Sequence, residues 1–430
     1  MADTPEVIRV AADILTKRYG GKQELVDVER LDGSGVAEVY RARVVNNPFF
    51  QHRSVVVKRS PASGDELVDA AFLRETVAYQ FATSLSPSAR PGPVLLGYDT
   101  AQRVLIISDL GDGRTLADAL RAADEATHTD ILRKLGKALG MMHAGTADEE
   151  DAFNVLLQRM TRSRPNSASL QKLRDRLLSH RIRIGVNVIE GAGVAIPAEV
   201  RIAAANVQSR LLRGGMRAFT PFDLTPDNIV ETDSAFHFLD YEWAGYRDVT
   251  FDVAFVVARF PAFLAAQPFN AQATEAFVDA WVREVRDVWP SVQHPDTLQA
   301  RITAALIGWA MSSVALLDPL SLSELAEHDE QLRADFVAAG VDVPLPDLGG
   351  ALEAGVSGPA SAHDVLRPHS QGPFTADEAL VRRDLRETFE SLAAFADAGV
   401  DPAYRTIYEF AQALACLLYT SPSPRDRTRS

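Results

Sequence analysis

Three oxygen-bearing side chains, two carboxylates and one amide, lie close together in the segment that spans residues 219–243. The stretch FTPFDLTPDNIV contains Asp223 and Asn228, and Asp240 follows at the end of FHFLD. Apolar residues on either side of the polar turn ETDSA predict two short strands that form a β-hairpin. Because a hairpin places its first and last residues side by side, we expect Asn228 and Asp240 to meet in space.

The chemistry of these side chains points to a metal-assisted proton transfer. An amide oxygen and a carboxylate are hard ligands that suit Mg²⁺, which makes Asn228 and Asp240 candidate metal ligands. Asp223 lies a few residues upstream on the loop that faces the same spot, where a carboxylate can accept a proton from an attacking hydroxyl. Taken singly, Asp223 and Asn228 would also fit turn residues that bond their own backbone. The order of the surrounding motifs therefore decides between the two interpretations.

The elements around this segment divide the chain into two parts. Helical spacing predicts helices over residues 5–19 and 65–86, and alternating apolar patterns predict strands within 25–45, 54–60, 93–100 and 103–110. After Gly113 the pattern is mainly helical, apart from the hairpin segment and a Gly/Pro/Ala-rich stretch at 340–373, which reads as a long loop. The sequence predicts an α+β fold with an N-terminal helix at 1–24, a β-rich lobe at 25–112 and a helical lobe at 113–415.

These segments resemble the aminoglycoside phosphotransferase and choline kinase family, which has a protein-kinase-like two-lobed fold. The catalytic loop of that family reads H-G-D-x-x-x-x-N and is followed by a hairpin with an Asp at its end. Asp223, Asn228 and Asp240 fall on these positions. The resemblance, which covers roughly residues 25–320, implies that Asp223 is the catalytic base and that Asn228 and Asp240 bind Mg²⁺.

Further motifs of the family follow in order along the β-rich lobe. The stretch LDGSGVAEVYRARV resembles a glycine-rich nucleotide loop, whose flexible backbone lets amide groups approach phosphates. A lysine in VVVKRS resembles the phosphate-binding lysine, a glutamate in LRETVAYQF resembles the acid that orients it, and LIISDLG resembles the inter-lobe linker that contacts adenine. The implied nucleotide-binding residues are Gly33, Ser34, Gly35, Lys58, Glu75, Ser108, Asp109 and Leu110.

Three positions depart from the family pattern, two at the catalytic loop and one at the glycine-rich loop. Pro221 and Phe222 stand where the family has His and Gly, and Glu38 replaces the third glycine of a strict kinase loop. The loop difference keeps an alternative open, namely a catalytically weak nucleotide-binding pseudokinase that acts as a sensor or binding module. A protein kinase is disfavoured, because Asp240 is not followed by Phe-Gly and no A-P-E segment is present.

Other conspicuous residues of the helical part are given structural interpretations. Asp252 in GYRDVTFDVAF resembles the acid that braces the family's catalytic loop, and His143 at a helix end is interpreted as structural. The four tryptophans fit a packed core better than a cation–π cage.

The resemblance implies Mg·ATP-dependent transfer of the γ-phosphoryl group to a hydroxyl of a small molecule, such as an aminoglycoside, an amino alcohol or a sugar. GTP stays open as the donor. The net charge of −14 is compatible with a cationic acceptor and argues against nucleic acid as the main partner. The longest uncharged apolar run, residues 302–317, is short for a membrane span. We therefore expect a cytoplasmic protein without a membrane partner; its acceptor and oligomeric state stay open.

The last fifteen residues form a separate unit of sequence. The stretch CLLYTSPSPRDRTRS at 416–430 resembles the translation of a sequencing-library adaptor, and we expect an adaptor-derived or disordered tail there. It contains the only cysteine, Cys416, so a disulfide framework and a multi-cysteine metal site are excluded.

Overall fold

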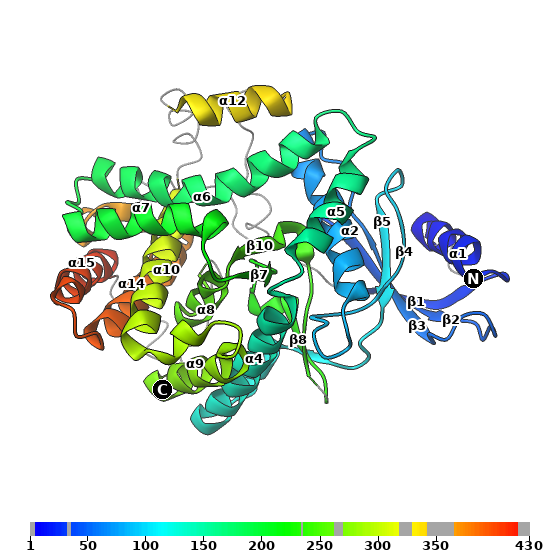
Figure 1. Ribbon diagram of the computed structural model, residues 1–430, viewed down its shortest axis with the longest axis horizontal. Helices are drawn as coiled ribbons and strands as arrows, with labels where there is room; N and C mark the ends of the chain where they lie inside the picture. Colours follow the sequence, from blue (N-terminus) through cyan, green and yellow to red (C-terminus); the bar gives the residue numbers. More distant parts are fainter. Residues whose placement is uncertain are drawn as a thin grey trace.

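The computed structural model describes residues 5–31, 36–233, 235–261, 270–317, 329–341 and 365–419. A small antiparallel sheet lies at one end of the molecule, and a larger set of helices makes up the rest (Figure 1). The chain is therefore α+β with two lobes, as the sequence predicts.

A five-stranded antiparallel sheet forms the N-terminal lobe, in the spatial order β1-β2-β3-β5-β4. Its central strands are rich in β-branched residues, which favour the pleated conformation, and Val55, Val57 and Ile106 are completely buried. The predicted order of three strands, a helix and two strands is confirmed. The strands are β1 Leu25–Leu31, β2 Glu38–Val44, β3 Ser54–Arg59, β4 Leu95–Asp99 and β5 Val104–Ser108.

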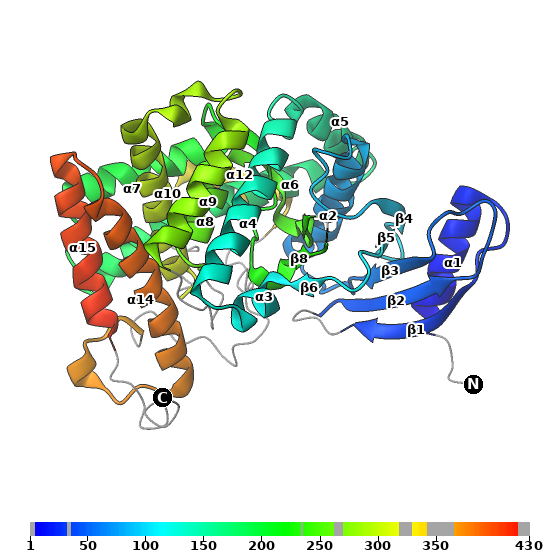
Figure 2. The same cartoon turned by 90° about the horizontal axis from the view of Figure 1, so that it is seen from below.

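Two helices cover opposite faces of this sheet. Helix α1 (Glu6–Tyr19) packs on one face and forms a small apolar core with the strands. Helix α2 (Glu66–Ser84) packs on the other face, and its apolar residues belong to the main core that continues into the helical lobe. Figure 2 shows α1 at the end of the molecule away from the helical lobe and α2 between the sheet and that lobe. Asp65 caps α2 by accepting hydrogen bonds from the backbone N–H groups of Leu67 and Val68.

The helical lobe is built from pairs of long helices in contact: α4 packs on α9, α6 on α10, and α14 on α15. Gly185 of α6 lies so close to α10 that a Cβ there would meet the carbonyl oxygen of Met311, and Gly136 of α4 approaches the carbonyl of Phe277 in α9 in the same way. Glycine is therefore required at both crossings. The helices are α3 Leu116–Ala122, α4 Glu125–Thr146, α5 Glu150–Thr161, α6 Ser167–Gly191, α7 Ala198–Arg213, α8 Thr250–Val257, α9 Ala271–Val285, α10 Pro295–Ala315, α12 Glu330–Ala339, α14 Ala376–Asp397 and α15 Pro402–Leu418.

Two small sets of strands within the helical lobe carry the segment that the sequence singles out. Strand β7 (Arg217–Thr220) pairs with β10 (Gly245–Asp248), and the second set has the order β6-β8-β9. Ile229 of β8 pairs with Phe238 of β9, which confirms the predicted hairpin. The remaining short elements are β6 Arg114–Thr115, β8 Ile229–Glu231, β9 Phe236–Phe238 and the 3₁₀ turns η1 Pro226–Asn228, η2 Tyr241–Trp243, η3 Pro290–Gln293 and η5 His369–Gln371.

The C-terminal helix runs further than the sequence suggests. Helix α15 continues through Cys416 to Leu418, which is completely buried, whereas the expected end of the helix is Ala415. The amphipathic pattern therefore extends into the first residues of the expected tail; residues 420–430 lie outside the described part, as does most of the expected loop at 340–373. Among the helices in the described ranges, none combines the length and apolar character needed to cross a membrane.

Candidate active site

Lys58 of β3 connects the two lobes through two ion pairs. Its ammonium nitrogen lies 2.8 Å from Oε1 of Glu75 on α2 and 2.9 Å from Oδ1 of Asp240 in the helical lobe. Burial by itself would lower the pKa of Lys58, but Asp240 and Glu75 outweigh it and hold that pKa well above its usual range. Lys58 therefore carries a permanent positive charge between two carboxylates that come from different lobes.

The hairpin places Asn228 beside Asp240. The backbone N–H of Leu239 donates to the carbonyl oxygen of Asn228 at 2.8 Å, and Asp240 follows directly, with φ 56° and ψ 72°. Asp tolerates this left-handed conformation better than most residues. In the described ranges no three His, Cys, Asp or Glu side chains are grouped to hold a metal ion. One amide and one carboxylate still fit Mg²⁺, because that ion keeps water and phosphate oxygens as most of its ligands.

Asp223 lies on the loop that follows β7. Its Oδ1 accepts a hydrogen bond from the backbone N–H of Thr225 at 3.1 Å. Burial raises the pKa of Asp223 to about 6, and the negative charge of Asp240 adds to the rise, while the hydrogen bonds from Thr225 oppose it. A carboxylate whose pKa lies close to neutrality suits a general base.

The raised pKa of Asp223 predicts a pH-dependent stability difference. A carboxyl group whose pKa is raised on folding contributes stability below its unfolded pKa, and this contribution is lost as the pH rises through the folded value, here about 6. Relative to the variant Asp223→Asn, the wild-type protein should lose about 1.4 kcal/mol of unfolding free energy between pH 5 and pH 8. Denaturant unfolding of both proteins at the two pH values measures this. Asp233→Asn, at an exposed turn of the hairpin, is the control and should show no such difference.

Phe222 adopts a backbone conformation that is unusual for its type. Its φ is 69°, in the left-handed region that glycine adopts readily, and strain there is on the order of 1–3 kcal/mol for other residues. Its ring lies 5.0 Å from the ring of Trp309 and 6.4 Å from that of Phe251, and the guanidinium of Arg247 stacks on it at 4.8 Å. This packing holds the strained residue that precedes Asp223.

Asp252 contacts a different partner from the one its motif implies. Oδ2 of Asp252 lies 3.2 Å from Nε2 of His143, and Trp281 Nε1 donates to Nδ1 of the same imidazole at 3.0 Å. His143 therefore accepts at Nδ1 and donates from Nε2, and all three side chains are completely buried. Within the described ranges, the side-chain hydrogen bond of Asp252 connects it to His143 of α4, which Trp281 of α9 contacts in turn, and not to the loop of Asp223. His143 has the structural environment that the sequence suggests.

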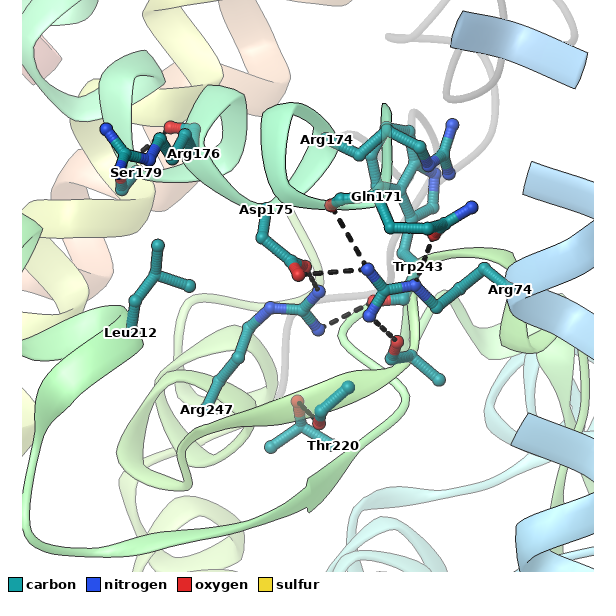
Figure 3. A network of polar contacts seen from close by, with 12 residues as sticks. Arg74, Gln171, Arg174, Asp175, Arg176, Ser179, Leu212, Thr220, Trp243 and Arg247 are labelled. Atoms are coloured by element: carbon teal, nitrogen blue, oxygen red, sulfur yellow. Dashed lines mark hydrogen bonds and ion pairs between the residues drawn. The ribbon is translucent and has the colours of Figure 1, made fainter. Parts of the chain in front are cut away.

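A buried charged network was not foreseen from the sequence. Asp175 of α6 bridges two arginines: its carboxylate oxygens lie 2.9 Å from Nη2 of Arg74 and 2.7 Å from Nη2 of Arg247 (Figure 3). Burial would raise the pKa of Asp175, but the two guanidinium groups hold it below its usual range. Arg74 directly precedes Glu75 on α2, and Arg247 stacks on Phe222. Asp175 therefore connects the helix that carries Glu75 to the loop that carries Asp223.

Neighbouring residues of α6 add further contacts to the same two segments. Oε1 of Gln171 accepts from Nε of Arg74 at 2.7 Å, and its Nε2 donates to the carbonyl of Ala70 at 2.8 Å. Arg174 donates to the carbonyl oxygens of Leu67 at 3.0 Å and Glu242 at 2.9 Å. Helix α6 thus holds α2 and the turn after Asp240 together. The only local signal in the sequence is that Arg74 adjoins a predicted site residue.

Two acids near the metal positions differ in their surroundings. Asp227 is exposed, whereas Glu242 is half-buried. Burial raises the pKa of Glu242, and the charge of Asp240 adds to the rise. Glu242 therefore contributes less negative charge at neutral pH than its side chain type suggests.

The linker between the lobes is anchored to the sheet. Ser108 exchanges two hydrogen bonds with Val94, of 2.8 Å and 2.9 Å, and Arg41 of β2 pairs with Asp109 at 3.0 Å and donates to the carbonyl of Gly111 at 2.8 Å. These contacts hold the backbone around Leu110 beside the sheet. The predicted glycine loop with Gly33, Ser34 and Gly35 lies outside the described residues.

No protein-family model and no curated protein matches the chain. Among solved structures it is similar to a choline/ethanolamine kinase family protein from Mesorhizobium loti, with 17% identity, 80% of this chain and 98% of that chain covered, and a TM-score of 0.40. It is similar to an ethanolamine kinase from Plasmodium vivax, with 14% identity and a TM-score of 0.40. The match covers 76% of this chain and 83% of that chain. It is also similar to an ADP-bound aminoglycoside phosphotransferase, with 12% identity and a TM-score of 0.40. The match covers 76% of this chain and 95% of that chain.

The identities are below 25% and the TM-scores below 0.5, so the assignment of a function depends on the geometry of this chain's own residues. The solved structures it resembles are choline and ethanolamine kinases and aminoglycoside phosphotransferases, the same family that its sequence motifs resemble.

Proposed function

We propose that the protein transfers the γ-phosphoryl group of Mg·ATP to a hydroxyl group of a small molecule. The observation that carries this proposal is the ion-paired position of Lys58 between Glu75 and Asp240. A lysine held between an acid of its own lobe and an acid of the other lobe is the arrangement that phosphoryl transfer uses to hold phosphates and metal together.

Each residue has a defined task in this reaction. Lys58 binds the α- and β-phosphates, and Glu75 keeps its ammonium group oriented. Asn228 and Asp240 would hold Mg²⁺, which supplies neutralisation of the charge that develops on the phosphate oxygens. The linker around Ser108, Asp109 and Leu110 provides backbone groups for the base of the nucleotide, and ATP and GTP both remain possible as donors.

Asp223 acts on the acceptor. The acceptor oxygen forms a bond to the γ-phosphorus, the bond from that phosphorus to the β–γ bridging oxygen breaks, and ADP leaves. The hydroxyl proton passes to the carboxylate of Asp223, whose pKa of about 6 leaves it ionised for most of the population at neutral pH. Positioning and charge neutralisation account for most of the rate in such transfers.

Pro221 and Phe222 motivate the pseudokinase alternative, but the surroundings of the loop do not favour it. The hydrogen bond from Thr225 orients Asp223, and Phe222 keeps a glycine-like backbone conformation through its ring contacts. An enzyme is therefore the function that the geometry supports best. Formation of ADP that depends on both Mg²⁺ and an added hydroxyl compound tests the proposal directly; Mg·ATP binding without such ADP formation, across a panel of neutral, anionic and cationic alcohols, would favour the alternative.

The variant Asp240→Asn should lose the effect of Mg²⁺ on nucleotide binding. The amide keeps the shape of the side chain but removes the charge that attracts the ion. At an ADP concentration of 100 times the dissociation constant, the wild-type protein should be stabilised by about 2.7 kcal/mol. Thermal unfolding with ADP, in the presence and absence of Mg²⁺, measures the part of this stabilisation that depends on Mg²⁺, which we call the Mg²⁺ increment.

Asp233→Asn serves as the control for this experiment, because it removes an acid from the exposed turn of the same hairpin. Its Mg²⁺ increment should equal that of the wild-type protein. An unchanged increment in Asp240→Asn would contradict the assignment of Asp240 as a metal ligand.

A further inference from the structure

A basic hollow lies between helices α5 and α6, which Figure 1 shows beside α2. Its volume is about 600 Å³, within the range of sites that bind small molecules. The wall includes Arg159 from α5, Arg162 and Arg164 from the link between the helices, and Ser169 from the first turn of α6. Among the described residues that line it, none is acidic and none belongs to the candidate active site.

The three arginines of the hollow have no ion-pair partner in the part of the chain that the structure describes. All three side chains are exposed. Three acids of the neighbouring helices already have arginine partners, namely Glu150, Asp175 and Asp335. The other acids near α5, at 148–151, lie at its opposite end, at least about 12 Å from Arg159 along the helix axis. The positive charge of the hollow is therefore not matched by a described carboxylate.

The first turn of α6 adds backbone donors to the hollow. Asn166 stands at the N-cap position with φ 58°, but its side chain caps no N–H group. Its amide nitrogen is directed at Gly340 of α12 and lies 2.5 Å from the position that a Cβ there would take. The backbone N–H groups of Ala168 and Ser169, which both line the hollow, donate to no described residue. Free N–H groups at a helix start attract anions.

The same turn of α6 is fixed to α2 by side-chain hydrogen bonds. Nε2 of Gln171 donates to the carbonyl of Ala70 at 2.8 Å, and its Oε1 accepts from Nε of Arg74 at 2.7 Å (Figure 3). Leu170 and Leu173 are buried in the main core. The donors of this turn are therefore held in place before a ligand arrives, which lowers the entropy cost of binding.

Three cations at this end of α6 are unfavourable without a counter-charge. The start of a helix is the positive end of its dipole and favours acids, yet the first turn of α6 contains none. The arginines also stand out on a chain whose net charge is −14. A bound anion would relieve the repulsion among the arginines and their repulsion with the helix dipole.

We propose that this hollow binds the phosphate group of a small phosphate monoester. Guanidinium groups match phosphate oxygens with paired N–H donors, and the start of α6 supplies backbone donors. Val155, which is 52% exposed, and Ala168 line the same hollow and offer an apolar surface to the body of the ester. The proposal does not depend on the proposed function, because neither Lys58 nor Asp240 lines the hollow.

Isothermal titration calorimetry without Mg²⁺ measures the affinity for two probes. Inorganic phosphate and phenyl phosphate share the charged group, but only phenyl phosphate has an apolar body. We expect phenyl phosphate to bind at least about threefold more tightly, because part of its ring leaves water against Val155. Equal affinities would assign the hollow to free phosphate and would refute the ester.

Arginine modification locates the site on the wild-type protein. Phenylglyoxal reacts with exposed guanidinium groups, and mass spectrometry of the digested protein gives the rate at each arginine. Phenyl phosphate at ten times its dissociation constant should slow the modification of Arg162 and Arg164 about tenfold. Arg213, which is exposed at the end of α7 and does not line the hollow, should react at an unchanged rate.

The double variant Arg162→Gln/Arg164→Gln should bind phenyl phosphate about tenfold more weakly, because two charge-assisted donors are lost. Arg213→Gln is the matched control, since it removes one exposed arginine from the same lobe, and it should keep the wild-type affinity. Mg²⁺-dependent ADP binding should be the same in both variants as in the wild-type protein, because the hollow contains no residue of the candidate active site.

Equal slowing of modification at Arg213, or the same slowing by sodium chloride at matched ionic strength, would overturn the inference, because either result indicates general screening of charge. Wild-type affinity for phenyl phosphate in the double variant would overturn it as well. These outcomes leave the proposed function to its own tests, since the Mg²⁺ increment and its loss in Asp240→Asn do not involve the hollow.

Discussion

Replacing Asp223 with asparagine should lower the rate of phosphoryl transfer by about 10³-fold, within the range that general bases contribute. The amide preserves the size of the side chain and its acceptor oxygen for Thr225, but it cannot take up the proton of the attacking hydroxyl. Nucleotide affinity should stay within about twofold, since Lys58, Asn228 and Asp240 are unchanged. Single-turnover transfer and equilibrium ADP binding, measured on the same preparation, give both quantities.

Asp233→Asn is again the matched control, with an expected rate equal to that of the wild-type protein. If Asp223→Asn transfers phosphate at the wild-type rate, Asp223 is not the base. If it instead loses nucleotide affinity, the carboxylate acts on the donor side of the reaction.

Removing the carboxylate of Asp175 should destabilise the protein by about 3 kcal/mol, because the loss of one partner leaves buried charges uncompensated. The side chains of Arg74 and Arg247 are only 4% and 2% exposed, whereas that of Asp175 is 30% exposed, so the buried charges are those of the two arginines. Asp175→Ala would leave both guanidinium groups without their shared carboxylate. Denaturant unfolding measures the loss. The ADP affinity of the folded variant should also fall, because Arg74 loses one of the contacts that fix the part of α2 that carries Glu75.

Asp335→Asn provides the comparison for this prediction. It breaks the ion pair between Asp335 of α12 and Arg176 of α6, whose side chains are 17% and 33% exposed, so that the arginine left behind is one that water reaches. An ion pair that water reaches contributes less than about 1 kcal/mol to the free energy of unfolding. An equal loss of unfolding free energy in the two variants, or an unchanged ADP affinity in Asp175→Ala, would contradict the role of Asp175 in positioning α2.

The sequence predicted the parts of the site that depend on local patterns. Hairpin periodicity placed Asn228 next to Asp240, and the strand and helix patterns placed Lys58 and Glu75 on elements that the structure brings together. These features depend on neighbours within a few residues or on the order of motifs. Their positions are therefore predictable from the sequence, whereas their roles in catalysis remain proposals.

The network around Asp175 was not predictable in the same way. Arg74 and Asp175 are far apart in the sequence, and neither lies in a motif that signals a partner. The conformation of Phe222 was equally hidden, because a left-handed phenylalanine depends on rings from α8 and α10 that surround it in the folded chain. The stacking of Arg174 and Arg181 on Trp243 also came only from the structure, since both arginines belong to a helix that precedes the loop by many residues.

The attachment of α2 to α6 has a consequence for how a nucleotide reaches its place. The apolar residues of α2 pack in the core of the helical lobe, whereas α1 and the outer face of the sheet form a core of their own. If the two lobes separate, we expect all five strands of the sheet to move together with α1, because β3 is hydrogen-bonded to β5 and the core around α1 includes residues of β4 and β5, while α2 stays with the helical lobe. This movement would lengthen the ion pair between Lys58 and Glu75, and binding of the nucleotide phosphates would restore it.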